Sequence, residues 1–264
     1  MNRTKLIIYL VAALAIAYNF FPEQTPPTQP GPAKVAPVAT QSIPDVNTYS
    51  MRPTDNKWPK MQDTQSAIDN NLVKKNYYLV FDGSGSMKES NCSNGQAKIS
   101  VAKQSVTQFI SKIPSDSNIG LLVFDKRGVF ERAVLGQSSK EQAVTQINLA
   151  TAGGGTPLDA AISHAYKALS QQAQKQLGYG EYHLIVITDG VASKGQDPSN
   201  TVRKFIQESP VVLHTIGFCI AGNHSLNQAG LTIYKSANNP RELEQGLDSV
   251  LAEVNDFNVN TFQD

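Results

Sequence analysis

The alternation of short apolar runs with longer amphipathic stretches between residues 74 and 254 constrains the fold most. The apolar runs are long enough for buried strands and too short for helices. Strands are predicted at 77–81, 119–124, 129–135, 181–188, 211–217 and 231–235, and helices at 97–113, 138–149, from 157 onward, 198–208 and 240–254. This order predicts an α/β fold, a doubly wound (Rossmann-like), mainly parallel sheet with helices on both faces and right-handed crossovers.

Local signals refine three of these elements. Residues 125–128 form a tight-turn sequence that leads directly into the strand 129–135, so this strand is predicted to run antiparallel at an edge of the sheet. Ser138 and Glu141 have the spacing of a capping box, which predicts that a helix opens there. Pro157 is predicted to lie in the first turn of the next helix, where its missing N–H costs nothing.

The first 21 residues have the pattern of an export segment. A basic start, with Arg3 and Lys5, precedes residues 6–18, which are apolar on all faces. Residues 6–21 then form either an uncleaved, slightly short membrane anchor with the basic residues in the cytoplasm or a signal peptide cleaved near Ala15 and Ala17. We favour a single-pass anchor in the cytoplasmic membrane with the domain on the periplasmic or extracellular side; secretion after cleavage is the alternative.

A proline-rich segment separates this start from the predicted domain. Nine of the fourteen prolines lie between Pro22 and Pro59, and proline both fixes φ and removes a backbone donor. We therefore predict an extended, semi-stiff linker over residues 22–73, a globular domain over 74–256 and a short tail over 257–264. The linker would hold the domain away from a membrane; a plain disordered tail is the alternative.

The overall charge gives no reason to expect a nucleic-acid partner. The formal net charge is +1, and the sequence has one Trp and no Lys/Arg-rich stripe interleaved with aromatic residues. Bulk charge therefore does not steer this chain toward polyanions.

The predicted strand 77–81 runs directly into Asp82, Gly83, Ser84, Gly85 and Ser86. Three oxygen-bearing side chains thus stand at alternating positions of a short turn, and the glycines are expected to allow a tight backbone path. Carboxylate and hydroxyl oxygens suit a hard divalent cation, Mg²⁺ before any softer metal. A turn rich in ordinary turn-forming residues is the alternative.

Two distant segments support the metal interpretation. Thr156 follows three glycines at the start of a predicted helix, and Asp189 directly follows the predicted strand 181–188. In doubly wound sheets ligands bind beyond the carboxyl ends of the strands. The predicted fold therefore brings Thr156 and Asp189 to the same end of the sheet as Asp82.

At these residues the chain resembles the von Willebrand factor type A (vWA) domain, over roughly residues 74–254. The metal-ion-dependent adhesion site (MIDAS) of that family consists of an Asp-x-Ser-x-Ser motif, a distant Thr and a distant Asp. The matching residues here are Asp82, Ser84, Ser86, Thr156 and Asp189.

The resemblance implies a non-catalytic protein-binding domain of the adhesion or assembly type. Its cofactor would be Mg²⁺, with Mn²⁺ and Ca²⁺ as alternatives. A metal held largely by neutral hydroxyls stays electrophilic, so it would accept an Asp or Glu carboxylate of a partner protein as its last ligand.

The alternative from another functional class is a metal-dependent, phosphatase-like hydrolase that uses Asp82. In haloacid-dehalogenase-like phosphatases a second carboxylate stands two residues after the first Asp, but here that position is Ser84. A serine nucleophile would need a base, and His164, His183, His214 and His224 are scattered along the chain. We therefore predict no catalytic residues.

Cys92 and Cys219, the two cysteines of the chain, match no zinc-binding spacing. Each follows a predicted strand, so both are expected near the metal-bearing end of the sheet. Outside the cytoplasm they could form a disulfide that closes a long loop; two unlinked thiols are the alternative.

Overall fold

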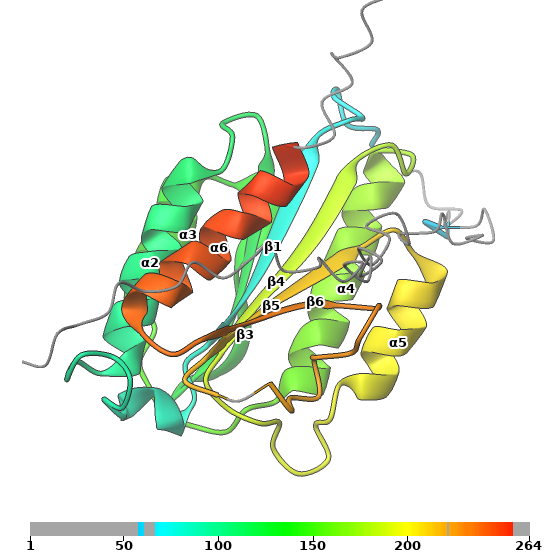
Figure 1. Ribbon diagram of the computed structural model, residues 1–264. Helices are drawn as coiled ribbons and strands as arrows, with labels where there is room; N and C mark the ends of the chain where they lie inside the picture. Colours follow the sequence, from blue (N-terminus) through cyan, green and yellow to red (C-terminus); the bar gives the residue numbers. More distant parts are fainter. Residues whose placement is uncertain (1–57, 61–66, 221, 256–264) are drawn as a thin grey trace, which may run out of the picture. The chain divides into compact units, whose positions relative to one another are not determined.

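A six-stranded sheet forms the centre of the computed structural model, which describes residues 58–60, 67–220 and 222–255 (Figure 1). The strands are β1 (Lys75–Asp82), β2 (Asn118–Asp125), β3 (Gly128–Ser138), β4 (Glu181–Thr188), β5 (Val212–Phe218) and β6 (Ile233–Ala237). Their order across the sheet is β3-β2-β1-β4-β5-β6. All neighbouring strands are parallel except β3, which pairs antiparallel with β2 at one edge. The predicted fold class and the antiparallel edge strand are therefore confirmed.

Helices cover both faces of this sheet, because its central strands are apolar on both sides. The helices are η1 (Gly85–Lys88), α2 (Lys98–Lys112), α3 (Lys140–Asn148), α4 (Leu158–Lys175), α5 (Ser199–Glu208) and α6 (Pro240–Asn255). Tyr77, Leu79 and Phe81 of β1 share one core with α2, α3 and α6. Tyr78 and Val80 share the other core with α4 and α5. Figure 1 shows these two layers of helices on either side of the strands.

The start of α3 differs from its prediction by one residue. The capping box consists of Ser139 and Gln142, not Ser138 and Glu141. The Ser139 hydroxyl accepts a hydrogen bond from the Gln142 N–H, and the Gln142 side chain accepts one from the Ser139 N–H. The reason is that β3 continues to Ser138, which still pairs with Ile119 of β2.

Two other boundaries also move. Pro157 caps α4 at the position before its first residue, Leu158, instead of lying within the first turn. Strand β6 begins at Ile233, two residues later than predicted, because Leu231 belongs to a turn. In that turn the N–H groups of Leu231 and Thr232 both donate to the Gln228 carbonyl oxygen.

The export segment, residues 1–21, and the tail, residues 257–264, lie outside the described residues, as does most of the linker. Among the residues that the structure describes, no helix is long and apolar enough to cross a membrane.

Candidate metal site

The site begins at the last residue of the central strand. Asp82 ends β1 and is fully buried. Its Oδ1 accepts a hydrogen bond from the Ser84 N–H at 2.7 Å, which turns the chain back over the carboxylate. Its Oδ2 accepts a hydrogen bond from the hydroxyl of Thr188, the last residue of β4, at 2.6 Å. One carboxylate oxygen is therefore held by the motif loop and the other by the end of β4.

The hydroxyls of the motif gather beside this carboxylate. Ser84 Oγ and Ser86 Oγ lie 3.1 Å apart, and Ser86 Oγ donates to Asp189 Oδ1 at 2.7 Å. Ser86 Oγ and Thr156 Oγ1 both lie within 4 Å of the point that a Cβ on Gly190 would occupy, at 3.6 and 3.9 Å. The structure thus brings together at one end of the sheet the five residues predicted from the sequence.

Backbone hydrogen bonds join the three loops that carry these residues. The Gly83 N–H donates to the Phe124 carbonyl oxygen at the end of β2, at 2.7 Å. In return, the Gly153 N–H donates to the Gly83 carbonyl oxygen at 2.8 Å, and the Gly85 N–H donates to the Gly154 carbonyl oxygen at 3.1 Å. The loop that carries the Asp-x-Ser-x-Ser motif is therefore fixed against the loop that leads to Thr156.

The structure does not bear out the reason predicted for glycine at positions 83 and 85 of the motif. Neither Gly83 nor Gly85 has a positive φ, so conformational freedom is not what they supply. A Cβ on Gly83 would lie 2.7 Å from the Asp125 Cβ, which is too close for any side chain, whereas a Cβ on Gly85 would meet only ordinary contacts. Close approach to β2 explains the first glycine, and nothing in the structure requires the second.

Thr156 is positioned by a serine that the sequence analysis missed. The Thr156 N–H donates to Ser193 Oγ at 2.9 Å, and the Ser193 N–H donates to the Thr156 carbonyl oxygen at 3.0 Å. Ser193 lies in the loop after β4, 37 residues further along the chain. Only the fold brings this serine to Thr156, so no local sequence signal marks it.

The site holds negative charge away from water. Burial raises the pKa of the Asp82 carboxyl to about 6, although the hydrogen bonds from Ser84 and Thr188 act in the opposite direction. Asp189 adds a second buried carboxylate, whose charge also raises the pKa of Asp82. A bound cation would offset this cost, because an opposite charge favours the ionised form of a carboxyl.

The residues present fit a hard divalent ion. They supply two carboxylates and three hydroxyls, which are the oxygen ligands that Mg²⁺ and similar ions prefer. In the part of the chain that the structure describes, no group of three or more His, Cys, Asp or Glu residues could hold a metal ion. A metal at this site would therefore depend on the hydroxyls of Ser84, Ser86 and Thr156.

Comparison with known proteins gives the family. The family model of the von Willebrand factor type A domain matches residues 76–263. The chain belongs to the vWA family. It is 29% identical over 189 residues to the uncharacterized protein YwmD of Bacillus subtilis, a match that covers 64% of this chain and 82% of YwmD.

Solved structures agree with this assignment. Proximal thread matrix protein 1 from the mussel byssus matches with a TM-score of 0.55 and 21% identity, over 68% of this chain and 47% of that one. The match thus spans about half of the mussel chain. A second structure of that mussel protein, with a zinc-occupied MIDAS motif, has a TM-score of 0.54 and 21% identity, covering 70% and 48% of the two chains. A von Willebrand factor type A structure from Catenulispora acidiphila has a TM-score of 0.55 and 16% identity, covering 68% and 42%.

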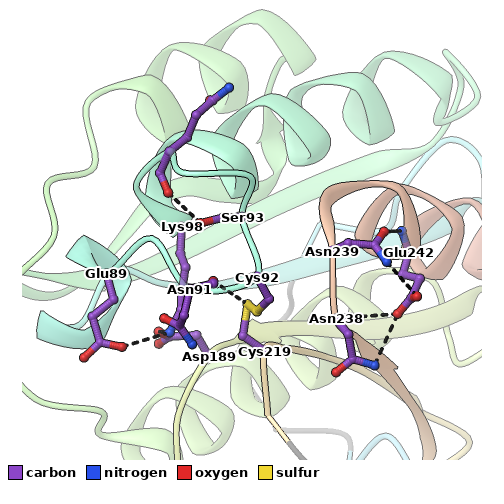
Figure 2. The surroundings of a disulfide bond; sticks show 11 residues. Glu89, Asn91, Cys92, Ser93, Lys98, Asp189, Cys219, Asn238, Asn239 and Glu242 are labelled. Carbon is purple, nitrogen blue, oxygen red and sulfur yellow. Dashed lines mark hydrogen bonds and ion pairs between the residues drawn. A yellow bond between two sulfur atoms is a disulfide. The ribbon is translucent and has the colours of Figure 1, made fainter.

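A disulfide flanks the site of this vWA domain (Figure 2). Cys92 and Cys219 are joined, with 6.1 Å between their Cα atoms and a sequence separation of 127. The bond ties the loop between η1 and α2 to the segment that follows β5.

The structure places the four histidines in three different surroundings. His183 and His214, on the neighbouring strands β4 and β5, are buried with their ring nitrogens 3.3 Å apart. His164 is about half exposed and lies 3.7 Å from Glu131. His224 was uninformative in the sequence, but its Nε2 lies 2.9 Å from the Gly190 carbonyl oxygen. It therefore supports the loop that follows Asp189.

Proposed function

We propose that this vWA domain binds a partner protein through a divalent ion, Mg²⁺ in the first place, and performs no catalysis. The observation that carries the proposal is the convergence of three hydroxyls and two buried carboxylates from three separate loops. The residues that would hold the ion are Asp82, Ser84, Ser86, Thr156 and Asp189.

The chain's own groups prepare this binding mode. When bound, the ion supplies an electrophilic coordination position for an anionic ligand. Ser86 donates its hydroxyl proton to Asp189 and therefore accepts in the hydrogen bond with Ser84, which leaves one lone pair of Ser86 Oγ for the ion. Asp82 is fixed through both of its oxygens. The carboxylate of an Asp or Glu side chain on the partner would be the matching ligand, because a hard ion prefers charged oxygen.

The same geometry argues against the hydrolase alternative. A nucleophilic Asp82 would need an oxygen that a substrate can reach directly, yet the residue is fully buried. Ser84, at the position of the second carboxylate in the phosphatases, cannot act as a general acid at neutral pH. The family is also one whose members are generally interaction modules.

Tethering to the cytoplasmic membrane through residues 6–21, with the domain outside the cytoplasm, is part of the proposal. The basic start followed by an apolar run supports it, and the disulfide suits an oxidising compartment. Fractionation of cells expressing the full chain should place it in the membrane pellet at its full mass. Recovery of a shortened chain from the medium would favour secretion instead.

The metal can be tested by unfolding the full chain in urea with Mg²⁺, Mn²⁺, Ca²⁺ or a chelator. An ion at about a hundredfold its Kd should raise the free energy of unfolding by about 2.7 kcal/mol. Asp82→Ala should abolish this gain. Asp116→Ala makes the same chemical change at an exposed residue and should leave it intact. An unchanged metal response in Asp82→Ala would refute the site.

The partner can be tested with the same variants. In a pull-down with the full chain as bait, a protein that the wild type retains in Mg²⁺ should be lost in chelator. It should also be lost with Asp82→Ala and retained with Asp116→Ala. Retention that ignores both the chelator and the Asp82 change would contradict binding through the metal. Turnover of a phosphate ester that Asp82→Ala abolishes would favour the hydrolase.

A further inference from the structure

A buried lysine contacts the candidate metal site, and neither the family motif nor the sequence analysis includes it. Lys98 is the first residue of α2 and is only 2% exposed. Its Nζ lies 3.0 Å from Asp189 Oδ2; both residues are labelled in Figure 2. The other oxygen of the same carboxylate accepts the hydrogen bond from Ser86. Asp189 is therefore shared between a motif hydroxyl and a fixed positive charge.

Burial makes this pair consequential. Charged side chains are almost never fully buried unless they are paired, and the Asp189 side chain is completely buried. Lys98 has a second partner, Glu89, at 3.2 Å, but the Glu89 side chain is 63% exposed. Water screens a largely exposed ion pair much more than a buried one. The buried contact with Asp189 is thus the stronger of the two.

The loop before Lys98 holds the lysine at this place. The Lys98 N–H donates to the Glu89 carbonyl oxygen at 2.8 Å, which closes the loop at its base. The disulfide between Cys92 and Cys219 anchors the middle of the same loop. The backbone of Lys98 is therefore fixed, and burial of its side chain leaves the ammonium group little freedom to leave Asp189.

We propose that Lys98 sets the net charge of the metal site and thereby selects an anionic ligand; this rests on the proposed function. A divalent ion with the carboxylates of Asp82 and Asp189 alone would be neutral. The buried ammonium group of Lys98 adds one positive charge, so the loaded site keeps a charge of +1. One carboxylate from the partner then completes neutrality.

Two opposite effects follow from this charge. Lys98 repels the divalent ion across a medium of low dielectric constant, so it weakens metal binding. It also attracts an incoming carboxylate, so it strengthens ligand binding to the loaded site. A residue with a purely structural role would not change the two affinities in opposite directions.

The test uses Mn²⁺ as the metal and acetate as the carboxylate, with the full chain. Mn²⁺ affinity is measured by calorimetry, and acetate affinity is measured by the displacement of water from bound Mn²⁺ in proton relaxation. Lys98→Gln removes the charge and keeps a hydrogen-bond donor. Lys98→Met serves in its place if the glutamine variant is unfolded, as judged by urea unfolding in chelator.

Lys98→Gln should bind Mn²⁺ about tenfold more tightly, equivalent to about 1.4 kcal/mol, and should bind acetate more weakly by a similar factor. The control Lys103→Gln makes the same change at another lysine of α2, whose Nζ donates to the Asn148 carbonyl oxygen at 3.0 Å. It should leave both affinities as in the wild type. Glu89→Gln should have a smaller effect than Lys98→Gln.

Equal or weaker Mn²⁺ binding by the Lys98 variants, or unchanged acetate binding, would overturn the role of Lys98. Absence of Mn²⁺ binding in the wild-type chain would instead overturn the proposed function. The two failures are therefore distinguishable.

Discussion

The two ends of β1 both bury polar side chains, but they satisfy them differently. At the amino end, Asn76 is fully buried. Its Nδ2 donates to Gln176 Oε1 at 2.8 Å and to the Glu181 carbonyl oxygen at 2.9 Å, and its Oδ1 accepts a hydrogen bond from Asn118 Nδ2 at 2.9 Å. Neutral amides thus match one another, donor to acceptor.

At the carboxyl end, six residues further along the same strand, the groups do not balance. Asp82 and Asp189 bring two negative charges, and the neighbouring serines and threonines bring neutral hydroxyls. Among the described residues of this site, Lys98 is the buried cation that contacts a carboxylate.

The balanced amides at Asn76 are typical of a network that supports the fold, whereas the unbalanced carboxylates at Asp82 are typical of a site prepared for a ligand. A closed set of neutral hydrogen bonds needs nothing more, whereas two buried carboxylates side by side, with the pKa of Asp82 raised, remain costly until a cation arrives. Three changes test this contrast, beginning with the one expected to have the largest effect on stability.

Asn76→Ala should lower the free energy of unfolding by about 3 kcal/mol, because it leaves the buried amides of Gln176 and Asn118 without their partner. Urea unfolding measures the loss. The gain from Mg²⁺ should remain that of the wild type, since the amide network lies at the opposite end of β1. Asn200→Ala, at an exposed residue, should change stability by less than about 0.5 kcal/mol. A lost metal response in Asn76→Ala would erase the distinction between the two ends.

Gly83→Ala should lower the free energy of unfolding by about 2 kcal/mol through overpacking, because the new Cβ would collide with Asp125. It should also weaken the metal response, since Gly83 links the motif loop to β2 and to the loop before Thr156. Gly85→Ala is the matched control. Its Cβ would lie 3.5 Å from the Gly154 carbonyl oxygen, an ordinary contact, and unfolding in chelator should detect almost no change. Equal losses in both variants would contradict the close-approach argument.

The pH dependence should differ between the two ends. Burial raises the pKa of Asp82 to about 6, so between about pH 4 and pH 6 the folded protein binds a proton that the unfolded chain has released. With chelator present, the Asp82 carboxyl therefore makes the free energy of unfolding fall as the pH rises through this range, by about 1 kcal/mol per pH unit.

Asp82→Asn should remove that contribution, as seen by comparing urea unfolding of the variant and the wild type at several pH values. Asn76→Ala should instead shift the whole curve by a constant amount, because the three amides of its network do not titrate. If the free energies of unfolding of the wild type and Asp82→Asn ran parallel against pH, Asp82 would not be the group responsible for this pH dependence.

Much of the fold was predictable because its signals are local. The apolar run and the amphipathic helix each follow from residues within one element, and their order implied the parallel sheet. Boundaries moved where a neighbouring element decided them. Pairing of Ser138 with Ile119 displaced the cap of α3 by one residue, and a turn at Gln228 delayed the start of β6.

The sequence by itself determined the alternation of elements and the order of Asp82, Ser84, Ser86, Thr156 and Asp189, since each of these follows a recognisable strand or opens a helix. Only the tertiary structure decided that these side chains meet, that Cys92 reaches Cys219, and that Thr188, Ser193 and Lys98 support the site. Lys98 looks like any lysine at the start of a helix. Its contact with Asp189 spans 91 residues, and a contact at that separation is set by how strands and helices pack, which no local pattern records.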